Sequence, residues 1–396
     1  MITAGEDPAV LPYLLALAAF ALVYVLTKAV RHSRPFTWIR TGFVPAEHGL
    51  VPLDALDPTR AGPPAPAHVT AERQAVADAV WAGDWRPAAA YAEAAGTDWD
   101  ERWDRLELLQ HLAEDGDGWL TDWRAEQPGS CDAATVAAAV LLHRAWAVRG
   151  SEYARKVPAA AMAEFRRLLP EAMTAAQRAA SLDPGHPGPW IVMATTARGM
   201  QYSAGQFQKI WQELCERAPH HAAAHWQALQ YWCAKWYGSD EAMLDFATAA
   251  VRYAPPGSTL PGLWLHALYE LETRNGSARP ALSTDSGKAL LGQVAHALAL
   301  VPEHHEDLPR LRHLLAHYLG QAGLHPLALA VFRQIGPWCG AYPWKHKDKD
   351  PVTEFHKARG LAAWAVLQSP AGKAAAAAGT AAGSGSGSGS GPAGAR

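Results

Sequence analysis

Along most of the chain, apolar residues recur at intervals of three and four, with polar and charged residues between them. This spacing places the apolar side chains on one face of a helix, whereas the period of two that indicates strands is nearly absent. Such segments follow one another from about residue 70 to 368, and Pro, Gly and capping residues separate them. The sequence therefore predicts an all-α body.

Capping residues predict where individual helices begin. Thr70, Thr97, Ser130 and Ser239 each precede a helical run, and Ser and Thr often accept a hydrogen bond from the first turn of a helix. Gly238 comes directly before Ser239. It is predicted to end the previous helix in a left-handed conformation.

Four prolines follow predicted helices at nearly regular intervals and indicate an internal repeat. They are Pro184, Pro219, Pro255 and Pro302, at intervals of 35, 36 and 47 residues. A polar insertion at 275–285 explains the longest interval. A period near 34 residues is typical of tetratricopeptide proteins, in which antiparallel helix pairs stack and bury one another's apolar faces. The segment 158–335 resembles this tetratricopeptide-like superhelix.

A second resemblance rests on three motifs. These are LQYWCAKWYGSDEAMLDFATAAVRYAPPGS at 229–258, AGDW at 82–85 and WAVRG at 146–150. With them, the body resembles a bacterial helical-repeat family known only as domain of unknown function 4034. This resemblance implies a helical-repeat body over most of the chain and no established activity.

An apolar stretch without charges, residues 9–27, stands apart from the helical body. As a helix it would cross roughly 28 Å, which is enough for the hydrocarbon core of a bilayer. Lys and Arg are absent before this stretch and cluster after it, so the positive-inside rule places the N-terminus outside and the C-terminal domain in the cytoplasm. A cleaved secretory signal and a buried core helix are the alternatives, but the basic segment and small-residue cleavage site of a signal are missing. We therefore expect a single-pass protein of the cell membrane.

These features divide the chain into five parts. We expect an anchor at 1–34, a Pro-rich linker at 35–69, N-terminal helical hairpins at 70–157, tetratricopeptide-like repeats with C-terminal capping helices at 158–368, and a disordered Ala/Gly/Ser tail at 369–396. The linker shows no sustained periodicity. The tail is too poor in large apolar residues to offset its ordering entropy.

Composition narrows the classes of function. The net charge of -3 provides no basic surface for nucleic acid. The chain has four separated cysteines without a C-x-x-C motif, which fits a reducing compartment. It contains no phosphate-binding loop, no dinucleotide-binding motif and no nucleophile-elbow motif. We expect a protein that is not an enzyme and has no cofactor.

Two histidine pairs are the strongest candidate metal ligands. His221 and His225, like His313 and His317, are four residues apart and would share a helix face. Neither pair has a third ligand, nor the Glu of an H-E-x-x-H motif. Histidines on a helix surface or in a groove are the preferred interpretation, and a metal-dependent enzyme using these pairs is the alternative function.

The candidate functional surface is the face that the first helices of stacked pairs would line. Six polar residues at these positions are not needed for a core: Arg198, Gln227, Gln230, Lys235, His266 and Glu270. A mixed polar set of this kind suits a protein or peptide, and it lacks the strongly basic cluster that predicts an acidic ligand. The sequence predicts a membrane-tethered cytoplasmic scaffold that binds a protein or peptide partner.

Overall fold

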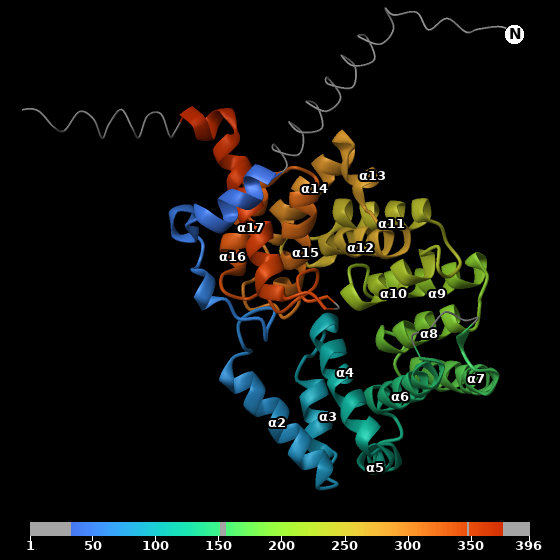
Figure 1. The fold of residues 1–396 in the computed structure, drawn as a ribbon. Coiled ribbons are helices and arrows are strands. Elements are labelled where there is room, and N and C mark those ends of the chain that lie inside the picture. The colour runs from blue at the N-terminus through green and yellow to red at the C-terminus, as the bar shows by residue number, and fades with distance from the viewer. Residues whose placement is uncertain (1–32, 151–155, 347, 375–396) are drawn as a thin grey trace, which may run out of the picture. The chain divides into compact units, whose positions relative to one another are not determined.

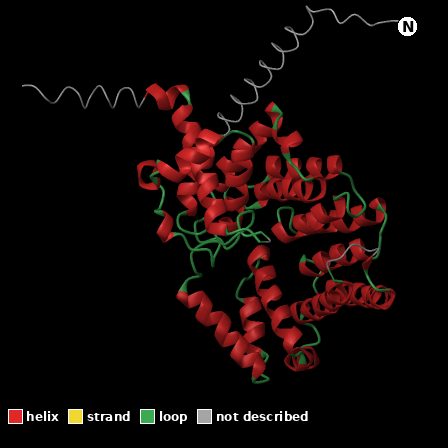
Figure 2. Ribbon diagram, viewed as in Figure 1, coloured by secondary structure: helices red, strands yellow, loops and turns green. Residues whose placement is uncertain are grey.

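The computed structural model describes residues 33–150, 156–346 and 348–374. Within these residues the regular structure is helical, with no strand and one isolated bridge between Asp57 and Trp338 (Figures 1 and 2). The prediction of an all-α fold is confirmed. The chain forms two compact units, one from Pro64 to Leu308 and one that combines the residues up to Pro63 with those from Pro309 onward.

The larger unit consists of helices that pack mainly on their neighbours in the sequence. They are α2 (Ala67–Trp81), α3 (Arg86–Glu93), α4 (Trp99–Asp115), α5 (Gly118–Glu126), α6 (Cys131–Arg149), α7 (Ala159–Leu182), α8 (Gly188–Gly199), α9 (Ala204–Arg217), α10 (Ala222–Trp232), α11 (Asp240–Tyr253), η4 (Leu260–Gly262), α12 (Leu263–Asn275), α13 (Arg279–Leu282) and α14 (Asp285–Leu298). Contacts also join alternate helices, from α6 to α8, from α8 to α10 and from α10 to α12. These alternate helices position the candidate site.

The apolar helix faces of this unit fill two core clusters. One cluster spans α6 to α10 and contains Phe207 and Tyr231, whose rings stack with centroids 3.7 Å apart. The buried hydroxyl of Tyr231 donates a 2.7 Å hydrogen bond to the Tyr202 carbonyl, so the polar end of the ring is satisfied. The other cluster spans α2 to α6 and is centred on large side chains such as Trp119 and Trp123.

The capping predictions are confirmed at two of four positions. Ser130 and Ser239 accept hydrogen bonds from the first turns of α6 and α11. The prediction at Thr97 was wrong by one residue, because the carboxylate of Asp98 caps α4. Thr70 lies within α2 and is not a cap.

Gly238 is needed for a reason other than the predicted one. Its backbone is not in the left-handed region, so the predicted conformation was wrong. A Cβ atom at this position would overlap the carbonyl oxygen of Trp232. Only glycine therefore permits the tight turn between α10 and α11.

The four prolines follow helix ends, as predicted. Pro184, Pro219 and Pro255 stand two residues after the ends of α7, α9 and α11, and Pro302 stands four residues after α14. The polar insertion at 275–285 contains the short helix α13.

The smaller unit is built from helical residues 33–41, η1 (Pro45–His48), η2 (Leu53–Ala55), α15 (Leu308–Gln321), α16 (His325–Ile335) and α17 (Pro351–Gln368). Residues 33–63 therefore contain more structure than an extended linker. Ile39 is buried, and a Cβ atom on Gly360 of α17 would lie 2.8 Å from its side chain. The guanidinium of Arg359 donates a 2.8 Å hydrogen bond to the Val51 carbonyl. The segment folds because α17 supplies these long-range partners.

The expected membrane helix at 9–27 lies outside the described residues, as does most of the expected tail. Among the residues that the structure describes, α6 is long and apolar enough to cross a membrane. However, 56% of its apolar window is buried within the structure, and α6 packs against α4, α7 and α8. Packing inside the larger unit therefore accounts for the apolar composition of α6.

Candidate functional site

Five of the six predicted residues lie on three helices, α8, α10 and α12, that contact one another in series, and the sixth follows α10. Arg198 is in the last turn of α8, and Gln227 and Gln230 share a face of α10 because they are three residues apart. Lys235 follows α10, and His266 and Glu270 share a face of α12 because they are four residues apart. We call these six residues the polar row.

Hydrogen bonds connect the members of the polar row from helix to helix. The Arg198 Nη1 atom donates to the Gln227 Oε1 atom at 3.1 Å, which links α8 to α10. The carboxylate of Glu270 accepts from the Gln230 side chain at 3.1 Å and from Lys235 Nζ at 2.7 and 2.8 Å. The structure thus brings together residues that are up to 72 positions apart in the chain (270 minus 198).

His266 joins the row through an aromatic contact. Its ring centroid lies 4.8 Å from that of Trp226 in an edge-to-face arrangement. Burial lowers the pKa of His266 to about 4, although nearby Asp307 and Glu270 act in the opposite direction. His266 is therefore neutral at pH 7 and supplies a polar ring without a charge.

Arg198 is the least satisfied member of the row. Its side chain is half-buried, and its Nε atom is buried without a hydrogen-bond acceptor among the described residues. Burial lowers the pKa of Arg198 to about 10, so the guanidinium keeps its charge at pH 7. Within the described residues no carboxylate forms an ion pair with it, because Glu270 is already bonded to Gln230 and Lys235.

Three residues that the sequence reasoning missed surround Arg198. They are Trp146 and Arg149 at the end of α6, and Trp236 after α10. The two indole rings meet edge to face with centroids 5.6 Å apart. The Arg198 Cζ atom lies 5.2 Å and 5.4 Å from the ring centroids of Trp146 and Trp236, and the Arg149 Cζ atom lies 5.5 Å and 5.3 Å from the same centroids. We call these four residues the Arg–Trp cluster.

The sequence contains part of the evidence for this cluster, but it does not show that the four residues meet. Trp146 and Arg149 are three residues apart on one helix, which places them on the same face. Trp236 is 90 residues from Trp146 (236 minus 146), and only the packing of α6, α8 and α10 brings the two together.

Acidic residues on α4 provide charge of the opposite sign within the same unit. Asp104 and Glu107 are three residues apart, and Asp307 lies close enough to interact with both. Loss of solvation and repulsion between these carboxylates raise the pKa of Asp104 to about 7. Asp307 also acts on His266, which places this acidic group near the α12 end of the polar row.

The two histidine pairs make contacts that hold the helices together. His225 Nδ1 donates to the His221 carbonyl at 2.9 Å, and His221 lies 3.0 Å from an Asp100 oxygen. Both ring nitrogens of His313 are bonded, one to the Ala61 carbonyl and one to the Trp344 indole. In the described part of the chain, no group of three His, Cys, Asp or Glu side chains is arranged to hold a metal ion.

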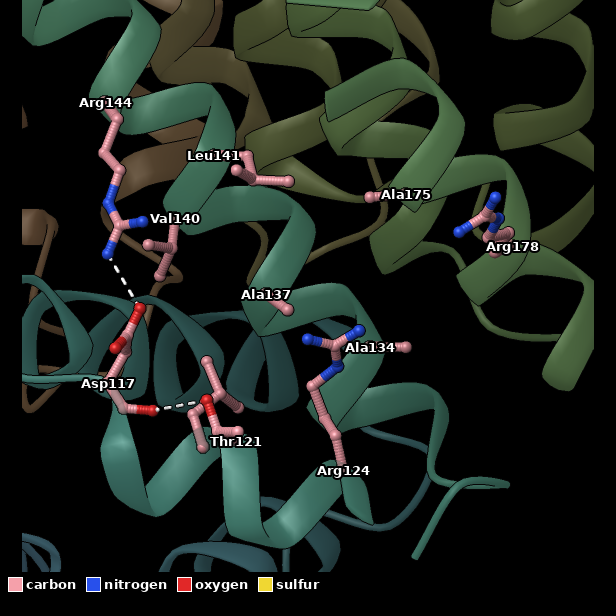
Figure 3. Close-up of a pocket in the computed structure, with 11 residues that line it drawn as sticks. Asp117, Thr121, Arg124, Ala134, Ala137, Val140, Leu141, Arg144, Ala175 and Arg178 are labelled. Atoms are coloured by element: carbon pink, nitrogen blue, oxygen red, sulfur yellow. Dashed lines mark hydrogen bonds and ion pairs between the residues drawn. The ribbon is translucent and has the colours of Figure 1, made fainter. Parts of the chain in front are cut away.

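A pocket of about 230 Å³ lies where α5, α6 and α7 meet (Figure 3). Arg124, Arg144 and Arg178 line it together with small apolar residues of α6. Figure 3 shows Arg144 paired with Asp117, and their charged atoms are 2.8 Å apart. The volume is below the roughly 300 Å³ at which ligand pockets usually begin, so the pocket suits a side chain better than a cofactor.

The chain matches no family model, no curated protein and no solved structure. The resemblance to domain of unknown function 4034 therefore stays a prediction.

Proposed function

We propose that this protein is a membrane-tethered cytoplasmic scaffold that binds a protein or peptide partner on the polar row and carries out no catalysis. The observation that carries the proposal is the state of Arg198. Its guanidinium is partly removed from water, and no acceptor in the described part of the chain reaches its buried Nε atom. A desolvated cationic donor without an acceptor is destabilising by about 1–3 kcal/mol or more. A negatively charged group of a bound partner beside this guanidinium offsets this cost.

We further propose that the helix pairs α8–α9, α10–α11 and α12–α14 are stacked as a tetratricopeptide-like superhelix. Two observations support this arrangement: each second helix ends before one of the regularly spaced prolines, and the first helices contact one another in series. Stacked helix pairs create long surfaces that suit extended peptides. The polar row follows the first helices across three successive pairs, as such a surface requires.

Residues 9–27 are proposed to hold this body at the cytoplasmic side of the membrane. The support is the uncharged length of the segment and the Lys and Arg residues that follow it. Protease added to intact cells should leave the body untouched, and protease added after membrane permeabilisation should degrade it. Degradation in intact cells would contradict the proposed orientation.

The binding proposal can be tested by photocrosslinking of the full-length protein in cells. A photoreactive amino acid at Lys235, which is exposed, should capture a partner that mass spectrometry identifies. The same amino acid at Tyr253, which is 74% exposed at the end of α11, is the control position. Arg198→Gln should reduce capture from position 235 at least fivefold. Capture of the same proteins from both positions, or capture unaffected by Arg198→Gln, would refute the proposal.

A further inference from the structure

We infer that the Arg–Trp cluster is a subsite for a carboxylate of the partner, contributed by an Asp or Glu side chain. This inference rests on the proposed function and adds the chemistry of the ligand to it. From the polar row alone, an acidic ligand was not expected, because the row contains Arg198 but not Arg149. The cluster adds the second arginine.

The cluster places two positive charges together. The guanidinium carbons of Arg149 and Arg198 each lie within 5.5 Å of the ring centroids of the same two tryptophans. The attraction between a cation and an indole face contributes about 0.5–2 kcal/mol, but it does not neutralise either charge. The two guanidiniums therefore repel each other, and the charge of Arg149 acts on Arg198 in that sense.

Within residues 33–150, 156–346 and 348–374, neighbouring carboxylates do not compensate these charges. Glu270 is held by Lys235 and Gln230, and no carboxylate of the described residues is ion-paired with Arg149 or Arg198. Among the residues that the structure describes, the Arg149 side chain has one hydrogen bond, which it donates to the carbonyl of Gly150 at 2.8 Å. The cluster thus carries two positive charges and an unused donor at Arg198 Nε.

The chemistry of the cluster favours a carboxylate over other anions. A guanidinium presents its N–H groups in a planar fork that matches the two oxygens of a carboxylate. The indole walls provide little replacement for the water shell of a phosphate dianion.

The two tryptophans allow a direct test in the full-length protein. The protein is labelled with 5-fluorotryptophan in detergent micelles, and Trp146→Phe and Trp236→Phe assign the two ¹⁹F resonances. The probe is Ac-Asp-Glu-Asp-Glu-NH₂, the uncharged control is Ac-Asn-Gln-Asn-Gln-NH₂, and sodium phosphate is a third titrant. We expect the acidic peptide to shift both resonances, and the amide peptide to leave them unchanged.

Arginine variants show whether the cluster causes the shift. Arg198→Gln should weaken binding of the acidic peptide at least tenfold, and Arg149→Gln should weaken it several-fold. Arg252→Gln is the matched control, because Arg252 is exposed on α11 and belongs neither to the polar row nor to the Arg–Trp cluster. Arg198→Lys keeps the charge but removes the fork, and it should restore only part of the affinity.

Three results would overturn the carboxylate inference. They are equal shifts with both peptides, a stronger response to phosphate than to the acidic peptide, and binding unaffected by Arg198→Gln. If these occur while Arg198→Gln still reduces photocrosslinking from position 235, the scaffold proposal stands and its partner offers a different acceptor. If the photocrosslinking also fails, both proposals are refuted.

Discussion

Arg102 on α4 holds the carboxylate of Asp132 on α6 with two hydrogen bonds, 3.0 Å from Nε and 2.6 Å from Nη2. His186 contacts the same carboxylate through Nε2 at 3.0 Å. Its Nδ1 accepts from the Gly188 N–H, so Nε2 is the donor. Asp132 thereby connects α4 and α6 with His186, which lies two residues before the start of α8. This network sets the relative positions of the helices that carry Arg149 and Arg198.

Asp132→Ala should destabilise the protein strongly. Asp132 is 4% exposed, and its removal leaves three donors, two of Arg102 and one of the buried His186, without their acceptor. Breaking a buried pair from one side costs about 3–5 kcal/mol. The free energy of unfolding, measured by urea denaturation with circular dichroism, should fall by this amount. Asp245→Ala on the exposed side of α11 is the control and should change it by less than about 0.5 kcal/mol. Equal effects of the two variants would show that the network contributes little.

The stability of the larger unit should fall between pH 6.5 and pH 4, in part because of His225. Burial lowers the pKa of His225 from 6.5 to about 4, so the unfolded chain binds a proton before the folded chain does. The contribution is complete above pH 6.5 and is lost as the pH falls toward 4, by up to about 3 kcal/mol. His225→Asn keeps an N–H for the His221 carbonyl but cannot titrate.

Urea unfolding at several pH values checks this prediction. The dependence of the unfolding free energy on pH between 6.5 and 4 should become shallower in His225→Asn by close to one proton. His68→Asn, at an exposed position of α2, should keep the slope of the unchanged protein. An unaltered slope in His225→Asn would mean that burial does not lower the pKa of His225 in the folded state.

The fold class and several helix ends were predictable because their signals are local. Apolar spacing shows which face of a helix is buried, and Ser130 or Pro219 marks a helix end through contacts within one turn. The folding of residues 33–63 was not predictable. It depends on Arg359 and Gly360, which are about 300 positions away in the chain.

In the candidate site, too, some residues were predictable from local helical spacing and others depend on tertiary packing. The helical phase was sufficient to name residues such as Gln227 and Glu270, because each lies on a regular helix with clear boundaries. The contribution of Trp236 depends on the turn after α10, whose path is set by tertiary packing. The sequence identified Arg149 only as part of a helix end. Its proximity to Arg198 depends on the packing of α6 against α8.

Replacing two glycines by alanine should change the stability of the protein in opposite directions. Gly238→Ala should destabilise the protein by about 1–3 kcal/mol, because the new Cβ overlaps the Trp232 carbonyl oxygen and the backbone must move. Gly292→Ala lies within α14 with no other atom within 4 Å of the new Cβ. It should stabilise the protein by up to about 1 kcal/mol, because alanine favours a helix over glycine. Thermal denaturation should move the two melting temperatures in opposite directions. A shift in the same direction would contradict the assignment of Gly238 to a backbone contact.

Arg359 fastens residues 45–56 to α17, and its replacement should release them. The side chain is fully buried, donates to the Val51 carbonyl at 2.8 Å and contacts His356 Nδ1 at 3.1 Å. Burial lowers the pKa of Arg359 to about 10, so it carries a desolvated charge at pH 7. Arg359→Met removes that charge but leaves the Val51 carbonyl without its donor, a loss of about 1–3 kcal/mol. Because the two effects oppose each other, the melting temperature should change little, whereas amide hydrogen exchange at 45–56 should become at least tenfold faster. Unchanged exchange in this segment would show that the aromatic and aliphatic contacts of residues 33–43 hold it without Arg359.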